Sequence, residues 1–109
     1  MQADEMRDLV VSALEDVKGV DIATLDVRGK TAITDFMVIA TGTSDRHVKA
    51  LADNVLAEAR KVGVKPLGVE GERSAEWILL DLNDVVAHVM IREVRDFYNL
   101  EKLWSVDSE

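Results

Sequence analysis

The segment Thr41-Gly42-Thr43-Ser44 contains the residue types that could hold a phosphate group. It follows an apolar run and precedes a helical pattern, so its turn would place backbone N–H groups at a helix N-terminus. The segment lacks the lysine and the glycine spacing of a P-loop, and it lacks the pattern G-x-G-x-x-G. A capped helix explains the same residues, because Gly42 permits a tight turn and Thr43 or Ser44 can cap the helix. The sequence therefore predicts a helix cap, with a nucleotide-binding site as the alternative.

Other kinds of catalytic chemistry need residues that the sequence supplies only in part. Nucleotidyl transfer uses metal-binding carboxylates on neighbouring strands, whereas Asp81 and Asp84 lie around a predicted turn. The two histidines, His47 and His88, are far apart and no cysteine is present, so a zinc site is not predicted. No nucleophile elbow occurs, although a Ser-His-Asp arrangement stays open because its members would meet only in space. We predict a protein that is not an enzyme, with no catalytic, cofactor-binding or metal-binding residues.

The charge of the chain favours a basic partner. The 109 residues include 13 Lys and Arg and 21 Asp and Glu, a net charge of −8. Such a protein is repelled by bare phosphate backbones, so a basic protein is the favoured partner, unless the acidity only keeps the domain soluble. Basic residues of the second predicted helix could make a minor RNA contact, although such residues more often form a solvated face with local ion pairs. These residues are Arg46, Lys49, Arg60 and Lys61.

The composition is that of one globular domain. The length of 109 residues and the apolar fraction of 48% fit a single domain over residues 1–109, with its core at about 5–104 and a short tail at 105–109. Without cysteine there is no disulfide. The first residues do not form a signal peptide, and no apolar run approaches the roughly 18 residues that span a bilayer. We therefore expect a cytoplasmic domain with no membrane contact.

The periodicity of apolar residues predicts the element order α-β-β-α-β-β-β-α. Helices are expected at residues 3–18 and 44–62, short helical or irregular structure at 92–104, and strands at 21–27, 36–41, 64–71, 76–82 and 85–91. The strand–helix–strand unit in the middle implies a right-handed parallel crossover. The expected fold is a single α/β domain, a mixed sheet of about five strands with helices packed against it. Large residues of the last segment are expected to pack on the core, namely Val94, Phe97, Tyr98, Leu103 and Trp104.

The predicted hairpin of the last two strands carries the strongest internal signal. If Leu82 pairs with Val85 across the Asn83-Asp84 turn, one face is entirely apolar and belongs on the core. That face holds Ile78, Leu80, Leu82, Val85, Ala87, Val89 and Ile91. The opposite face is mixed and holds Trp77, Leu79, Asp81, Val86, His88 and Met90. Either a helix covers this mixed face, or the face is exposed and binds a partner.

Three blocks of the sequence resemble the ribosomal silencing factor family, RsfS, also called Iojap-related proteins. The blocks are LDVRGKTAITDFMVIATGTSDRHVKALADNV, PLGVEGERSAEWILLDLNDVVAHVMI and FYNLEKLW, in this order. The resemblance covers nearly the whole chain and implies a mixed α/β domain similar in shape to nucleotidyltransferases, without their catalytic carboxylates. The chain departs from the family at Asn83, where Gly is common. Because Asn also tolerates a positive φ angle, we expect the turn to survive.

The resemblance also implies a function. Family members bind the large ribosomal subunit through its fourteenth ribosomal protein, at the face that meets the small subunit. They thereby block subunit joining and repress translation in starvation or stationary phase. Relatives in mitochondria and chloroplasts act in ribosome assembly. These statements follow from the resemblance, because composition and spacing alone do not point to the ribosome.

We expect the mixed face of the hairpin to dock on the partner, so that the bulk of the domain blocks the small subunit. Trp77 would be the anchor, and Asp81 with Glu70 would bind Lys or Arg of the partner. The apolar surround and a supporting imidazole would come from Leu79, Val86, Met90 and His88. Two alternatives remain. The face could close a homodimer of the free protein, or the chain could be a nucleotide-dependent enzyme of nucleotidyltransferase shape that uses the turn at residues 41–44.

Overall fold

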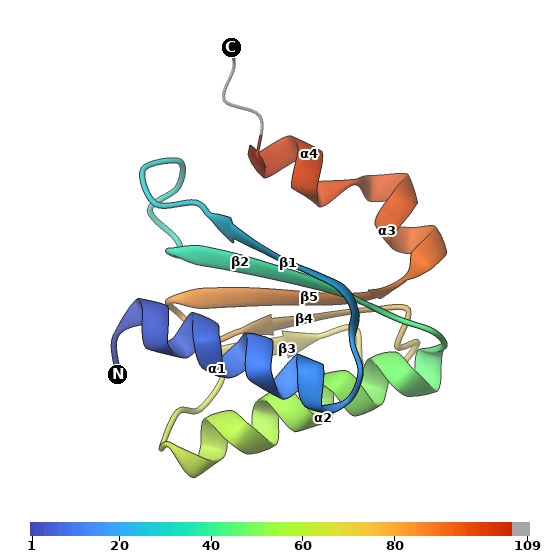
Figure 1. The fold of residues 1–109 in the computed structure, drawn as a ribbon, viewed down its shortest axis with the longest axis horizontal. Coiled ribbons are helices and arrows are strands. Elements are labelled where there is room, and N and C mark those ends of the chain that lie inside the picture. Colours follow the sequence, from blue (N-terminus) through green and yellow to red (C-terminus); the bar gives the residue numbers. More distant parts are fainter. Residues whose placement is uncertain (106–109) are drawn as a thin grey trace.

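The chain folds as one α/β domain, and the computed structural model in Figure 1 describes residues 1–105. The helices are α1 (Ala3–Asp16), α2 (Asp45–Lys61), α3 (Arg92–Tyr98) and α4 (Leu100–Ser105). The strands are β1 (Val20–Asp26), β2 (Phe36–Gly42), β3 (Gly68–Glu70), β4 (Trp77–Asp81) and β5 (Val85–Ile91). The predicted order is confirmed, except that the last helix is divided in two at Asn99, which has a left-handed φ of 49°. Of the predicted tail, residues 106–109 lie outside the described part of the chain.

The sheet is mixed, with the strand order β1-β2-β5-β4-β3. The central pair β2–β5 is parallel, and the other neighbouring strands pair antiparallel. Because two antiparallel pairings separate β3 from β5, β3 runs in the same direction as β2. The predicted parallel crossover through α2 is therefore confirmed in direction, but it joins strands that are not neighbours.

Helices α1 and α2 cover one face of the sheet and lie together below it in Figure 1. Each helix has one apolar stripe that it turns toward the sheet. The buried residues of the two stripes are Met6, Val10, Ala13, Leu14, Val48, Leu51, Ala52, Val55 and Ala59. With the inward residues of the central strands they form the main core. None of the helices in the described part of the chain is long and apolar enough to cross a membrane.

The hairpin of β4 and β5 has the predicted register. The Leu82 N–H donates to the Val85 carbonyl at 2.9 Å, and Trp77 lies opposite Met90. Asn83 adopts a φ of 73°, the left-handed conformation that a tight hairpin turn requires. The all-apolar face of the hairpin consequently lies in the main core, as expected.

The other face of the sheet is covered only in part. Helices α3 and α4 lie on this side (Figure 1), against β1, β2 and β5, and close a second apolar cluster. Its buried members are Val27, Met37, Ile39 and Met90. Helices α3 and α4 have seven and six residues. Since each is only about 10 Å long, they leave the face over β4 and β3 open to solvent.

The last segment packs differently from what the sequence suggests. Val94 packs on the second cluster, as expected. Three other large residues are exposed at 80%, 53% and 70%, namely Phe97, Tyr98 and Leu103. Their expected packing on the core is wrong. In α3 the side toward the sheet is taken by Val94 and Arg95, and in α4 it is Leu100 that packs on the second cluster. The Trp104 side chain lies outside the described part of the chain.

A methyl group at Gly42 would clash with the start of α2. An ideal Cβ there would lie 2.7 Å from Val48 Cγ2 and 2.9 Å from the Val48 backbone nitrogen. Because the helix backbone cannot give way, we expect Gly42→Ala to lower the free energy of unfolding by about 1–3 kcal/mol. Urea unfolding measures the change. Gly68→Ala is the matched control, because nothing lies within 4 Å of its Cβ position. Equal losses in the two variants would contradict the steric explanation.

Candidate functional site

The turn at residues 41–44 is a helix cap in which the Thr43 N–H is already bonded. Ser44 Oγ accepts from the His47 N–H at 3.1 Å, which confirms the predicted cap. The Thr43 N–H donates to His47 Nδ1 at 2.9 Å, and His47 Nε2 lies 2.7 Å from the Val17 carbonyl. With the ring hydrogen on Nε2, both ring nitrogens are satisfied, and the imidazole ties the turn to the end of α1. This geometry engages the N–H groups of Thr43 and His47, two of the donors that a phosphate could use, so it does not favour the nucleotide-binding alternative.

Asp81 and Asp84 of the hairpin turn make structural contacts, the first through its carboxylate and the second through its backbone carbonyl. Asp81 Oδ1 accepts from the Asn83 N–H at 2.9 Å, and the Asp84 carbonyl accepts from the N–H groups of Asp35 and Phe36. Within residues 1–105, no group of three or more His, Asp or Glu side chains is arranged to hold a metal ion. The hairpin turn therefore offers no metal site, and the predicted docking residues lie on the strands of the sheet.

The open part of the sheet carries the candidate site. Strand pairing places Glu70 of β3 opposite Leu79 of β4, and alternation along β4 puts Trp77, Leu79 and Asp81 on that same face. We call these four residues the β4 face. Trp77, Leu79 and Asp81 are half-buried, and Glu70 is exposed. Four of the predicted site residues thus share one surface that solvent reaches.

The three predicted site residues on β5 lie beneath this surface. Met90 has an exposure of 0% and belongs to the second apolar cluster. The His88 and Val86 side chains are also buried, with exposures of 6% and 9%. The expected place of Met90 in an exposed apolar surround is therefore wrong, because β5 is a central strand that α3 covers on this face. Because they are buried, His88 and Val86 can support the residues of the β4 face but contribute little surface for a partner to contact.

Trp77 is oriented by His88. The indole Nε1–H donates to His88 Nδ1 at 2.9 Å, and the ring centroids lie 5.8 Å apart. Burial disfavours the charged imidazolium and lowers the pKa of His88 to about 4. At neutral pH the ring is therefore uncharged, and Nδ1 keeps the lone pair that accepts the indole hydrogen.

Two further aromatic residues extend the β4 face onto α3. The Tyr98 ring lies 4.9 Å from the Trp77 ring, and the Phe97 ring lies 4.9 Å from the Tyr98 ring in an edge-to-face arrangement. Such distances are typical of favourable aromatic pairs. We call Trp77, Tyr98 and Phe97 the aromatic strip. Sequence reasoning did not place Phe97 and Tyr98 in the site, because the spacing of apolar residues does not show which side of a seven-residue helix meets the sheet.

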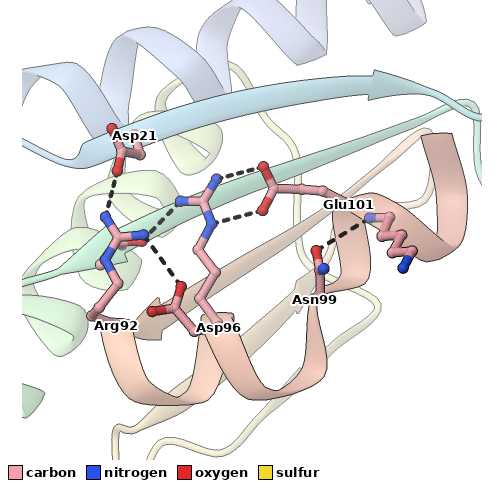
Figure 2. Close-up of polar contacts among 8 residues, drawn as sticks. Asp21, Arg92, Asp96, Asn99 and Glu101 are labelled. Carbon is pink, nitrogen blue, oxygen red and sulfur yellow. Dashed lines mark hydrogen bonds and ion pairs between the residues drawn. The ribbon is translucent and has the colours of Figure 1, made fainter.

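A polar cluster joins α3 to α4 beside the aromatic strip. Arg95 is 5% exposed and donates two hydrogen bonds of 2.9 Å to the Glu101 carboxylate. A third bond of 2.8 Å goes from Arg95 to Thr41 Oγ1, at the end of β2. Figure 2 shows the Glu101 carboxylate held by two parallel bonds. These bonds favour the ionised carboxylate and hold the pKa of Glu101 below its ordinary value.

Comparison with known proteins agrees with the three sequence blocks described above. Residues 1–109 match the model of the family described as "Ribosomal silencing factor during starvation". The chain belongs to this family. The ribosomal silencing factor RsfS of Haemophilus influenzae is 47% identical over 98 residues, which cover 90% of this chain and 96% of that protein. A mouse protein named mitochondrial assembly of ribosomal large subunit protein 1 is 32% identical over 104 residues, 93% of this chain and 46% of that protein.

Solved structures of similar proteins share the fold. A crystal structure of a Chromobacterium violaceum protein superposes with a TM-score of 0.95 at 45% identity, over 100% of this chain and 91% of that one. A Bacillus halodurans protein gives a TM-score of 0.85 at 38% identity, over 93% of this chain and 94% of that one. The expected single domain with a five-stranded mixed sheet is therefore also the fold of these relatives.

Acid should destabilise the fold through His88. Its folded pKa lies below its ordinary value, so the unfolded chain binds the proton more readily. The stability from the neutral ring is complete above pH about 6.5 and is lost as the pH falls toward about 4, by roughly 3 kcal/mol in total. In urea unfolding across this range, the wild type should lose stability more steeply than His88→Gln, which keeps an acceptor for Trp77 but does not titrate. Parallel pH profiles would contradict this assignment.

Proposed function

We propose that this ribosomal silencing factor binds the large ribosomal subunit through that subunit's fourteenth ribosomal protein and keeps the small subunit from joining. Translation would be repressed in this way in starvation or stationary phase. Membership of the family gives the chain its ribosome-associated silencing role. The observation that carries the docking proposal is the open aromatic strip with its acidic rim.

The aromatic strip has the make-up of a protein-binding surface. Tyr98 and Phe97 are exposed at 53% and 80%, and Trp77 is half-buried beside them with its indole N–H already bonded. Large uncovered apolar patches on single domains mark sites of interaction, and Trp and Tyr are enriched among the residues that dominate binding energy. Leu79 adds apolar area on the same face of β4. Trp77 is therefore our proposed anchor, with Tyr98 and Leu79 around it.

Acidic side chains around the strip fit a basic partner. Glu70 and Asp81 lie on the β4 face, and Glu93 is exposed on the first turn of α3. The whole chain carries a net charge of −8. A basic ribosomal protein would be attracted to this surface, whereas bare RNA would be repelled. The charge thus supports a protein as the main contact on the ribosome.

A minor contact with ribosomal RNA is a subsidiary part of the proposal. Of the four basic residues of α2 considered for this role, Lys49 and Lys61 form ion pairs within the helix at 2.9 and 2.8 Å. Arg46 and Arg60 are exposed and would carry the contact. Two cations on one helix make it a weak contribution beside the aromatic strip.

The silencing would be steric. The domain measures 38 × 33 × 21 Å along its principal axes. A body of this size on the face that meets the small subunit occupies space that the small subunit needs. The proposed mechanism requires no reaction and no cofactor, and the protein would act with the ribosomes in the cytoplasm.

We also propose that the free protein covers the strip by forming a homodimer, in which a second copy takes the place of the ribosomal protein. Each copy carries a charge of −8, so repulsion between the copies should weaken this dimer at low salt. Light scattering during dilution measures the mass. The mass of a single chain at every concentration and salt level would contradict the dimer.

Truncation of the anchor should weaken binding to the large subunit. We expect Trp77→Ala to reduce the affinity by roughly thirty-fold or more, about 2–4 kcal/mol, because a buried aromatic anchor contributes this much at interfaces. Co-sedimentation with isolated large and small subunits measures the effect. Tyr98→Ala tests the strip with a side chain that is already mostly exposed, so its folding should be unaffected.

Ile33→Ala is the matched control for these truncations. Ile33 is 78% exposed and lies in the loop before β2, at the end of the sheet away from Trp77. Its truncation should leave the affinity unchanged. If folded Trp77→Ala and Tyr98→Ala proteins bound large subunits as tightly as wild type, the strip would not be the docking site.

Removal of the acidic rim should slow association. We expect the double variant Glu70→Gln/Asp81→Asn to lower the association rate about tenfold at low salt, with a smaller difference at high salt, because salt screens electrostatic steering. The amide introduced by Asp81→Asn would still offer an oxygen to the Asn83 N–H. Stopped-flow association with large subunits measures the rate. The control, Glu15→Gln/Asp16→Asn, removes two exposed acids from the end of α1. A loss that is independent of salt, or equal in the control, would contradict steering by this rim.

A further inference from the structure

The aromatic strip depends on two helices that are too short to be stable alone. Helices α3 and α4 have seven and six residues, whereas isolated helices shorter than about 12 residues are marginal in water. Phe97 and Tyr98 contribute little to holding α3 in place, since their side chains are exposed at 80% and 53%. Other residues of these two helices must therefore set the position of the two rings.

Apolar packing alone leaves the angle between the two helices open. Val94 of α3 and Leu100 of α4 pack against the second apolar cluster. Hydrophobic contacts of this kind are not directional. Asn99 joins the helices with a left-handed φ of 49°, so the joint is one residue between two short elements. A fixed angle at such a joint requires directional contacts across it.

Arg95 supplies these directional contacts. From α3 its guanidinium reaches back to Thr41 of β2 and forward across the joint to Glu101 of α4, with three bonds of 2.8 to 2.9 Å. Two parallel bonds to one carboxylate fix its plane as well as its distance. Arg95 is 5% exposed, so water competes little for the guanidinium. Three elements of the fold are thus joined at one side chain.

The neighbouring ion pair of Arg92 is a weaker link. Arg92 bonds Asp21 of β1 and lies 3.7 Å from Asp96 (Figure 2), beside a hollow of about 290 Å³ that Glu101 also lines. The Arg92 and Asp21 side chains are 45% and 62% exposed. Exposed pairs of this kind contribute little to stability. The orientation of α4 relative to α3 therefore rests mainly on Arg95.

We propose that Arg95 is the positioning residue of the aromatic strip: through Glu101 and Thr41 it holds Tyr98 against Trp77 and so presets the surface that binds the partner. A surface that is already ordered binds more tightly, because less conformational freedom is lost on association. The inference rests on the proposed function for the identity of that partner. It also gives a role to Thr41, a buried residue of the turn at 41–44 that takes no part in capping α2.

Glu101→Gln is the test variant, because glutamine keeps the size of the side chain but removes its charge and one acceptor. Glu101 lies at the surface, so the fold should persist. We expect faster amide exchange at Asn99 and Leu103, loss of the NMR contact between the Tyr98 and Trp77 rings, and about tenfold weaker binding to large subunits. Amides of β5 should keep their protection. Glu15→Gln, which removes an exposed acid of α1 on the other side of the sheet, should change none of these readouts.

A double-mutant cycle separates positioning from general structural support. If Arg95 acts through Tyr98, Glu101→Gln should weaken binding little further once Tyr98→Ala has removed the ring. Additive losses would overturn the inference. An intact contact between the Tyr98 and Trp77 rings in Glu101→Gln would overturn it as well.

The failure of the inference can be distinguished from the failure of the proposed function. If the wild type binds large subunits and folded Glu101→Gln binds them equally well, the inference is wrong and the proposed function stands. If the wild type does not bind them, the proposed function is wrong. The ring contact then still decides whether Arg95 positions the strip: its loss in Glu101→Gln supports the positioning, and its persistence overturns it.

Discussion

The central strands β2 and β5 must be buried on both faces, and the rest of the structure depends on how the chain covers them. Every residue of β2 is buried, and so is every residue of β5 except the last. Parallel strands of this kind are normally covered on both sides. On one side α1 and α2 provide 14 and 17 residues of helix. On the other side α3 and α4 provide only seven and six residues of helix. Most of β4 and β3 therefore stays uncovered on that side of the sheet.

The shortness of α3 and α4 explains why the buried Arg95 is needed between them. A buried ion pair adds little net stability, because the loss of hydration offsets much of the attraction. Val94 and Leu100 can supply the free energy that keeps α3 and α4 on the sheet, since they pack on its apolar cluster. What they cannot supply is a defined angle at Asn99. The hydrogen bonds of Arg95 are directional, so they specify geometry where apolar packing leaves it loose.

The sequence predicts those features that depend on neighbouring residues. The register of the hairpin could be predicted because a slip by one residue would turn its apolar face to water, and Asn83 suits the turn. The cap at Ser44 is likewise local. Met90 and Leu79 alternate onto the same face, yet one is buried and the other half-exposed. That difference comes from the position of β5 beside β2, a pairing between distant segments that periodicity does not reveal.

The placement of His88 beneath Trp77 has a consequence for how binding can be regulated. A solvated histidine changes charge near neutral pH, and a protein that uses one as an anchor contact responds to small changes in pH. Here burial lowers the pKa of His88 to about 4, and the neutral ring is the form that accepts the indole hydrogen. The orientation of Trp77 is therefore constant across the pH range in which ribosomes work. If the partner docks on the β4 face as proposed, His88 does not make this docking sensitive to pH near neutrality, whereas salt would still act on it by screening the acidic side chains.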